Sequence, residues 1–177
     1  MSQRQISTEL IHKGRIIEIR KDRVQLPDGH VVMRDVVLHP GAVVVLAVTA
    51  DGRIPFVRQY RYAAGEELLE LVAGTVEPGE NIAVTAGREL QEEAGYKAGK
   101  LTKLGEFYSA PGFCSELLHL YLAEELTESR LPGDEDEQIE VEMLTLQEAF
   151  DLARTGKIKD AKTLAGLMLY AAQSGLR

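Results

Sequence analysis

The sequence predicts a mixed α/β fold, a layered domain in which short strands are combined with a few helices. Three observations predict it. The chain has 177 residues, of which 45% are hydrophobic, and this is enough for one domain with a substantial core. Short β-branched segments recur along it, and three other segments place apolar residues at helical spacing. The order of strands, helix, strands and helices is typical of a layered α/β or α+β domain.

The strands are expected from the N-terminus onward. Residues 15–38 mix β-branched and charged residues and are broken by a Pro-Asp-Gly turn signal at 26–30, so they predict a β-hairpin. Residues 41–48 predict a buried strand, and 54–60 are expected to form the second half of a hairpin with it. Further strands are expected at 68–72, 101–108, 117–122 and 140–144.

Three helices are expected, and the first two have a recognisable start. Asn81 is a good N-cap for a helix that runs to Ala94 and ends at Gly95. Thr145 opens a Thr-x-x-Glu capping box for the second helix. The third covers about 160–173, and its expected apolar stripe comprises Leu164, Leu167, Met168 and Ala171. We interpret the last two helices as packing elements.

Charge and composition exclude several classes of partner. The formal net charge is −8, so we expect no nucleic-acid partner, although a small phosphorylated ligand stays compatible if a divalent cation is bound. The single Cys114 excludes an intramolecular disulfide and a Cys-based zinc site. No targeting signal is visible, and the longest apolar run, 42–47, is far below the ~18 residues of a membrane span. We therefore expect no membrane association and a cytoplasmic location.

Three glutamates fall on one face of the first expected helix. Glu89, Glu92 and Glu93 are separated by three or four residues, so their like charges repel. A solvated acidic face is one explanation, and a divalent cation is the other, because Mg²⁺ takes carboxylate oxygens and keeps waters for substrate phosphates. Arg88 lies one turn before Glu92 and can brace it. Glu80, in the preceding loop, can point its carboxylate toward the same three glutamates.

The spacing of the segment 74–96 favours the metal site. It resembles the Nudix box, whose fixed positions are matched by Gly74, Glu80, Arg88, Glu89, Glu92, Glu93 and Gly95. The resemblance implies the Nudix fold, an α/β/α sandwich around a mixed β-sheet, here with an N-terminal β-hairpin extension. It also implies hydrolysis of a nucleoside diphosphate linked to another moiety. A ligand-binding regulator that had lost turnover would have a damaged box, and this box is intact.

Segments outside the box are similar to the ADP-ribose pyrophosphatase subgroup. They are the strand 70–74, Pro111 at sixteen residues after Gly95, the acidic stretch 134–141 and the tail 156–163. The resemblance implies metal-dependent hydrolysis of the diphosphate bond of ADP-ribose to AMP and ribose 5-phosphate. The alternative is a Nudix hydrolase of another nucleoside diphosphate derivative, either a nucleotide-sugar such as GDP-mannose or a dinucleotide.

The resemblance also implies roles for individual residues. The metal ligands carried over are Ala73 (through its carbonyl), Glu89, Glu93, Glu92 and Glu137. The cation implied is Mg²⁺, with Mn²⁺ or Zn²⁺ as alternatives. In this subgroup the catalytic base comes from the acidic loop, which here contains Glu135 and Glu137. We choose Glu135 as the base, and the alternative that Glu137 is the base stays open. Arg88 and Glu92 support catalysis.

The remaining expectations concern the substrate and the assembly. The resemblance implies that Arg61 contacts phosphate, and a guanidinium suits bidentate phosphate binding. Arg58, Arg34 and the subgroup's proline, Pro111, are the other substrate-binding residues expected. The aromatic that stacks on the base stays open among Tyr60, Tyr62, Tyr108 and Phe113. The resemblance further implies that residues 1–40 form an N-terminal extension that mediates a homodimer and that residues 41–177 form the Nudix hydrolase domain.

Overall fold

The computed structural model describes residues 2–133 and 138–175 of the chain. It divides into two compact units. The first comprises Met1–Gly41 with Tyr108–Leu117, and the second comprises Ala42–Phe107 with Leu118–Arg177. Within the described ranges, no helix is long and apolar enough to cross a membrane.

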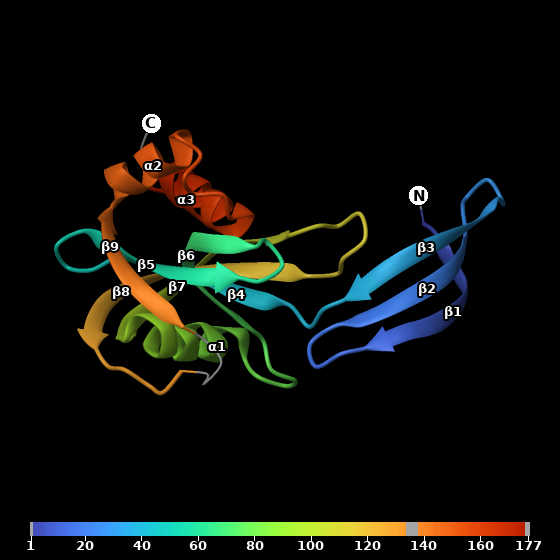
Figure 1. Cartoon of the computed structure of the whole chain (residues 1–177), viewed down its shortest axis with the longest axis horizontal. Helices are drawn as coiled ribbons and strands as arrows, with labels where there is room; N and C mark the ends of the chain where they lie inside the picture. The colour runs from blue at the N-terminus through green and yellow to red at the C-terminus, as the bar shows by residue number, and fades with distance from the viewer. Residues whose placement is uncertain (1, 134–137, 176–177) are drawn as a thin grey trace. The chain divides into compact units, whose positions relative to one another are not determined.

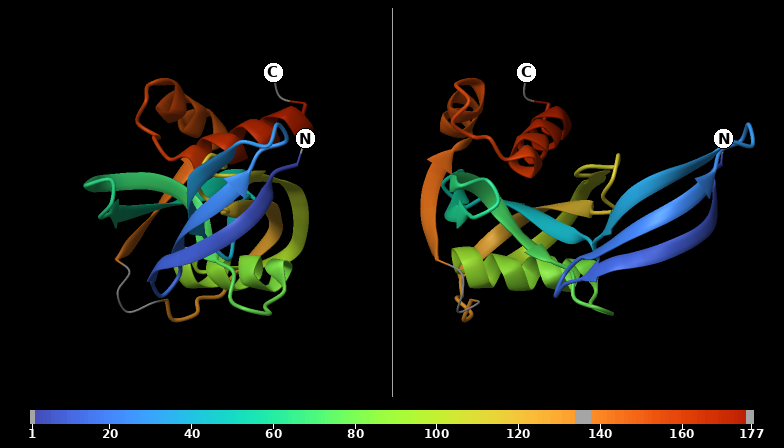
Figure 2. Two further views of the ribbon diagram at one scale, coloured as in Figure 1. Left: turned by 90° about the vertical axis from the view of Figure 1, so that its right-hand side faces the viewer. Right: turned by 45° about the vertical axis from the view of Figure 1, so that its right-hand side comes forward.

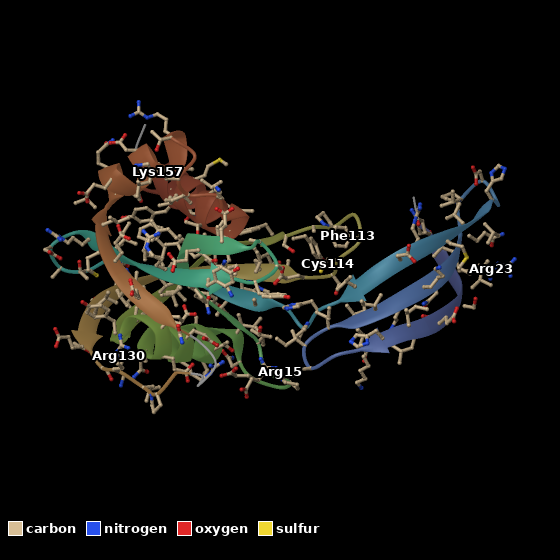
Figure 3. The ribbon with its side chains drawn as sticks, in the orientation of Figure 1. Arg15, Arg23, Phe113, Cys114, Arg130 and Lys157 are labelled. Atoms are coloured by element: carbon tan, nitrogen blue, oxygen red, sulfur yellow. The ribbon has the colours of Figure 1, made fainter. Side chains whose placement is uncertain are left out.

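The first unit is a three-stranded antiparallel sheet in the order β1-β2-β3. The predicted hairpin is confirmed as β2 (Glu18–Gln25) and β3 (Val31–Leu38). Strand β1 (Arg4–Lys13) adds an edge that we did not predict, because all of its residues are exposed and no apolar alternation marks it. The loop carrying Phe113 and Cys114 (Figure 3) is fastened to β3, since Val37 N–H donates to the Phe113 carbonyl at 2.8 Å.

The second unit contains a six-stranded sheet in the order β7-β8-β4-β6-β5-β9. Its strands are β4 (Ala42–Ala47), β5 (Arg53–Arg61), β6 (Glu66–Thr75), β7 (Tyr96–Tyr108), β8 (Leu117–Glu128) and β9 (Ile139–Thr145). Strand β4 is parallel to β8 and antiparallel to β6, so the sheet is mixed, as expected.

The predicted hairpin between residues 41–48 and 54–60 is wrong. Strand β6 lies between β4 and β5, and it pairs with β5 up to Leu71 and with β4 from Val72 onward. The tight turn after β5 makes β6 its hairpin partner, and β6 is long enough to reach β4 as well. Local turn signals cannot reveal this exchange of neighbours, because the pairing of β4 is non-local.

The three predicted helices are α1 (Ile82–Glu89), α2 (Leu146–Arg154) and α3 (Ala161–Gln173). Their expected N-caps are confirmed, with Asn81 accepting from the Ala83 N–H at 2.9 Å and Thr145 forming its capping box. Helix α1 covers one face of the six-stranded sheet, and α2 and α3 cover the other (Figures 1 and 2). The second unit is therefore an α/β/α sandwich.

The expected apolar stripe of α3 is shifted around the helix. Leu167 is buried, but Met168 is 65% exposed. The helix instead meets the sheet through Gly166, where a Cβ would come within 2.7 Å of the Leu71 side chain. Thr163 is also fully buried on this face. A stripe counted on large apolar residues therefore misses a contact made by glycine and threonine.

Candidate active site

The helix that carries the acidic stripe does not end as a regular α-helix. It continues as a π-helical turn, η1 (Leu90–Ala94), and the chain leaves it at Gly95, whose φ of 78° is left-handed. We predicted an α-helix up to Ala94, so this turn differs from the prediction. Such π-helical turns are frequent at functional sites. The turn buries Leu90 in the core and leaves Glu93 only 6% exposed.

Strand β6 and this helix meet at two carboxylates. Glu93 Oε2 accepts a hydrogen bond of 3.0 Å from the Ala73 N–H. The Glu89 carboxyl group occupies the space beside Gly74, where a Cβ would lie 1.9–2.3 Å from its three atoms. Any side chain at Gly74 would therefore displace it. Of the five expected ligand positions, the structure brings Ala73, Glu89 and Glu93 together at one point of β6. Glu92 contacts Arg88 instead, and Glu137 lies outside the described residues.

Arg88 contacts three carboxylates. Its Nη1 lies 2.8 Å from Glu89 Oε1 and 2.7 Å from Glu92 Oε2, so the expected contact with Glu92 is present. Its Nε and Nη2 donate to Glu80 at 3.2 and 3.3 Å. Burial alone would lower the pKa of Arg88, but the hydrogen bond to Glu80 and the charges of Glu89 and Glu92 outweigh it and raise that pKa. The Arg88 hydrogen bond in turn lowers the pKa of Glu80.

The oxygen atoms gathered here suit a hard divalent cation. Mg²⁺ is usually held by one or two carboxylates and keeps several waters, which matches Glu89 and Glu93 beside the Ala73 backbone. In the described part of the chain, no three His, Cys, Asp or Glu side chains are close enough to enclose a metal ion. Glu89 and Glu93 therefore fit a site that water and substrate would complete.

The two expected phosphate-binding arginines of β5 each have a carboxylate partner. Arg61 donates from Nε and Nη2 to Glu70 at 2.8 and 2.7 Å, a bidentate contact. Arg58 Nη2 lies 2.6 Å from Glu142 Oε2 on β9. The side chains of Arg61 and Arg58 are 38% and 37% exposed, so part of each stays accessible.

Glu70 is a buried carboxylate that sequence reasoning missed. It is 1% exposed and also contacts the Lys162 ammonium of α3. Burial alone would raise the pKa of Glu70, but the hydrogen bond from Arg61 and the charge of Lys162 hold it below its ordinary value. The signal was available, because a lone glutamate inside the apolar run 68–72 requires a charged partner once the strand is buried.

Two expected substrate residues belong to the first unit. Pro111 lies in a turn in which the Phe113 N–H donates to the Ala110 carbonyl at 3.1 Å. Arg34 lies on β3, directly opposite Asp22 of β2.

The acidic loop and the aromatic candidates complete the set of expected residues. Glu135 and Glu137, the expected base and metal contact, lie outside the described residues. The aromatic candidates are all more than half exposed: Tyr60, Tyr62, Tyr108 and Phe113.

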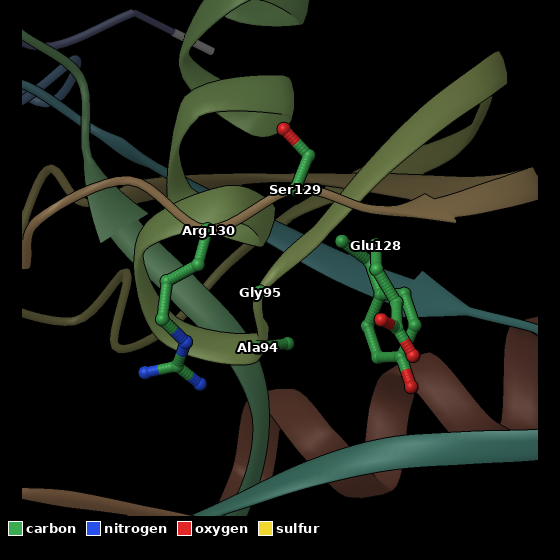
Figure 4. A pocket seen from close by; sticks show the side chains of 6 residues that line it. Ala94, Gly95, Glu128, Ser129 and Arg130 are labelled. Carbon is green, nitrogen blue, oxygen red and sulfur yellow. The ribbon is translucent and has the colours of Figure 1, made fainter.

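A hollow of about 430 Å³ lies at the end of η1, and none of the expected site residues that the structure describes lines it. Arg130 and Glu128 extend on opposite sides of the turn at Ala94 and Gly95 (Figure 4). A Cβ at Gly95 would lie 3.1 Å from Arg130 Nε. Gly95 therefore serves both the left-handed exit from the helix and the packing of this arginine.

Comparison with known proteins places this geometry in a family. Residues 37–167 match the NUDIX domain, and residues 4–37 match the nucleoside diphosphate sugar hydrolase N-terminal domain. The ADP-ribose pyrophosphatase of Bacillus subtilis (strain 168) is 41% identical, over 100% of this chain and 97% of its own. The methanol dehydrogenase activator of Bacillus methanolicus is 40% identical, over 97% and 94%. The GDP-mannose pyrophosphatase of Escherichia coli (strain K12) is 37% identical, over 70% and 69%.

A crystal structure of an ADP compounds hydrolase has the same fold. Its TM-score is 0.87 at 23% identity, and the match covers 100% of this chain and 98% of that one. The expected α/β/α fold is thereby confirmed. The box geometry, the domain match and the full-length similarity agree, and the chain belongs to the Nudix hydrolase family.

Proposed function

We propose that this Nudix hydrolase cleaves the diphosphate of ADP-ribose to give AMP and ribose 5-phosphate. The observation that carries the proposal is the meeting of Glu89 and Glu93 at the Ala73–Gly74 backbone. Its support is a full-length relative, 41% identical, that is an ADP-ribose pyrophosphatase. Nudix hydrolases generally need a divalent metal. Mg²⁺ suits the donor set, and Mn²⁺ and Zn²⁺ are the alternatives.

Hydrolysis forms a bond from a water oxygen to one phosphorus and breaks the bridging P–O bond, whose oxygen leaves with the other phosphate. A bound divalent ion would neutralise the diphosphate and lower the pKa of an attached water. Glu89 and Glu93 would hold that ion against β6. Arg88 keeps Glu89 and Glu92 in place through contacts of 2.8 and 2.7 Å. A carboxylate base takes the proton that the attacking water loses.

Glu93→Gln tests the metal site. The loss of one ligand charge should weaken Mg²⁺ binding and lower kcat by orders of magnitude. Without metal the Tm should hold or rise slightly, since the repulsion from Glu89 is relieved. Calorimetric titration with Mg²⁺, thermal melts and steady-state kinetics measure these effects. A fully active Glu93→Gln enzyme would move the metal site elsewhere and contradict the proposal.

We assign the catalytic base to Glu135 and a metal contact to Glu137. A general base contributes typically about 10²–10⁴-fold, so Glu135→Gln should lower kcat by that factor at nearly unchanged Mg²⁺ affinity and KM. Glu137→Gln should instead weaken Mg²⁺ binding. If Glu135→Gln stays active and Glu137→Gln loses activity at unchanged metal affinity, the two roles are exchanged.

We assign substrate contacts to Arg61, Arg58, Arg34 and Pro111. The half-exposed guanidinium groups of Arg61 and Arg58 support phosphate binding, although each shares its donors with a carboxylate. Conversion to lysine keeps the charge and removes the planar fork. Arg61→Lys should therefore raise KM more than it lowers kcat, and an unchanged KM would argue against this contact.

Substrate identity is tested directly by a panel with Mg²⁺. We expect kcat/KM for ADP-ribose to exceed the values for GDP-mannose, NADH and diadenosine polyphosphates. The similarity to a GDP-mannose pyrophosphatase makes a nucleotide-sugar the second candidate. If ADP-ribose ranks below GDP-mannose, the substrate assignment is wrong while the family assignment stands. The net charge of −8 supports a small-molecule substrate over nucleic acid, and a cytoplasmic location stays a prediction from the sequence.

We propose that residues 1–40 mediate a homodimer and that residues 41–177 form the hydrolase domain. Residues 4–37 match a separate N-terminal domain family. Strand β1 is a fully exposed edge that carries the apolar Leu10 and Ile11, and such edges are usually covered. Light scattering should give a dimer of 19.5-kDa chains, and a Leu10→Asp, Ile11→Asp double variant should be monomeric. A monomeric wild type at micromolar concentration would refute the proposal.

A further inference from the structure

Strand β6 changes its partner immediately before the candidate metal site. It pairs with β5 up to Leu71 and with β4 from Val72 onward. At this crossover, side chains hold two backbone N–H groups. Leu71 donates to Thr163 Oγ1 at 2.8 Å, and Ala73 donates to Glu93 Oε2 at 3.0 Å. Buried backbone donors need acceptors, so both bonds help to fix where β6 runs.

Thr163 belongs to a polar network at the first turn of α3. Its hydroxyl and its N–H donate to Asp160 Oδ2 at 2.6 and 2.9 Å. Lys162 Nζ contacts the Glu70 carboxylate and lies 3.0 Å from Asp160 Oδ1. Thr163 is 0% exposed and Glu70 is 1% exposed. Helix α3 therefore contacts two successive residues of β6: Lys162 contacts the side chain of Glu70, and Thr163 accepts from the backbone of Leu71.

We propose that Thr163, supported by Lys162, is a positioning residue for the metal site. The inference rests on the proposed metal-dependent function. Asp160 orients the Thr163 hydroxyl, and this hydroxyl fixes the Leu71 backbone. The proposed metal-binding segment, Ala73 and Gly74, begins two residues later. A strand advances about 3.3 Å per residue. A displacement of the backbone at Leu71 would therefore be transmitted to Ala73 over only two residues. The proposal also gives a role to Asp160, Lys162 and Thr163, which the catalytic residues do not explain.

Thr163→Val tests the proposal, because valine keeps the shape and removes the hydroxyl. The Leu71 N–H then loses its acceptor, and β6 must shift or admit water. Loss of a group that orients metal ligands typically costs about 10–100-fold in metal affinity or activity. We expect the Kd of Mn²⁺, followed by electron paramagnetic resonance on the full chain, to rise at least about tenfold. Thr163→Ser restores the hydroxyl and should recover most of the affinity.

Leu46→Ala is the control for general loss of stability. Leu46 is fully buried in the core cluster that also contains Leu71, but it lies beyond the end of the β4–β6 ladder. It should lower the Tm at least as much as Thr163→Val while Mn²⁺ affinity stays close to wild type. If Leu46→Ala weakens Mn²⁺ binding equally, or Thr163→Val leaves it unchanged, the proposal fails.

A second variant covers the case in which Thr163→Val does not fold. Lys162→Met leaves the Leu71 bond intact and removes one cation from Glu70, so a smaller loss of Mn²⁺ affinity is expected. An unchanged affinity there would likewise overturn the support assigned to Lys162. The Mn²⁺ titration needs no substrate, so an error about ADP-ribose would not alter its result. If the wild-type protein binds no Mn²⁺, both the proposed metal site and this inference are refuted.

Discussion

Gly74→Ala adds one methyl group where β6 meets helix α1. It should inactivate the enzyme without unfolding it. The new Cβ would lie 1.9 Å from the Glu89 carboxyl carbon, whereas ordinary contacts begin near 3.4 Å, so this group must retreat by about 1.5 Å. A misplacement of about 1 Å can cost roughly 100-fold in rate. We therefore expect kcat to fall at least about 100-fold. Gly74 has no left-handed φ, so alanine fits the backbone and the Tm should fall only a few degrees.

Gly87→Ala is the matched control, measured for kcat, Mn²⁺ affinity and Tm alongside Gly74→Ala. Gly87 lies in α1, and its Cβ would meet the nearest atom, Leu101 Cδ1, at 3.8 Å, an ordinary contact. Alanine is preferred to glycine inside a helix by about 0.5–1 kcal/mol. The control should thus be fully active and slightly more stable. If Gly74→Ala retains near wild-type kcat and Mn²⁺ affinity, Glu89 does not hold the metal from this position, and the reasoning is refuted.

Three further variants probe the charges and the backbone around the site. Arg88→Met should lower the Tm in metal-free buffer by roughly 3–12 °C, from about 1.5–3 kcal/mol of lost charged hydrogen bonds, and Mg²⁺ should restore more of the Tm than in wild type. Glu70→Gln should destabilise most near pH 7, because the lowered pKa of Glu70 contributes stability above its ordinary value of 4.5. This stability is lost as the pH falls from 4.5 through the lowered pKa, so the melts should converge with wild type only below the lowered pKa. Gly95→Ala should lower the Tm, at about 1–2 kcal/mol for the left-handed residue, with kcat nearly unchanged.

The parts of the molecule that sequence reasoning could predict are those fixed by local chemistry. Asn81 and Thr145 cap helices because their side chains accept from nearby N–H groups, and both bonds are present. The i,i+4 spacing of Arg88 and Glu92 implied a contact that the structure shows at 2.7 Å. The position of Gly74 relative to Glu89 is a spacing of the same kind, although its physical reason, the close approach of the carboxyl group, appears only in three dimensions.

The parts that could not be predicted depend on contacts between distant segments. The antiparallel partner of β4 is β6 and not β5, and its parallel partner is β8, so both pairings are non-local. Arg58 meets Glu142 across 84 positions of sequence, and no local spacing indicates it. The buried face of α3 uses Thr163 and Gly166, residues that a count of apolar positions passes over.

From the charges around helix α1 we expect that metal must be present before the substrate binds well. Glu80, Glu89 and Glu92 surround Arg88, and Glu93 lies at the Ala73 N–H. Four carboxylates against one guanidinium leave a formal charge of −3 when all are ionised. A diphosphate is also anionic, and two like charges 4 Å apart repel by about 4 kcal/mol at an effective dielectric constant of 20. Arg61 and Arg58 of β5 each already contact a carboxylate, Glu70 and Glu142, so they offset this charge only in part. We therefore expect a divalent cation from solution to make this face attractive to a diphosphate, and we propose that Glu89 and Glu93 hold it beside the Ala73–Gly74 segment.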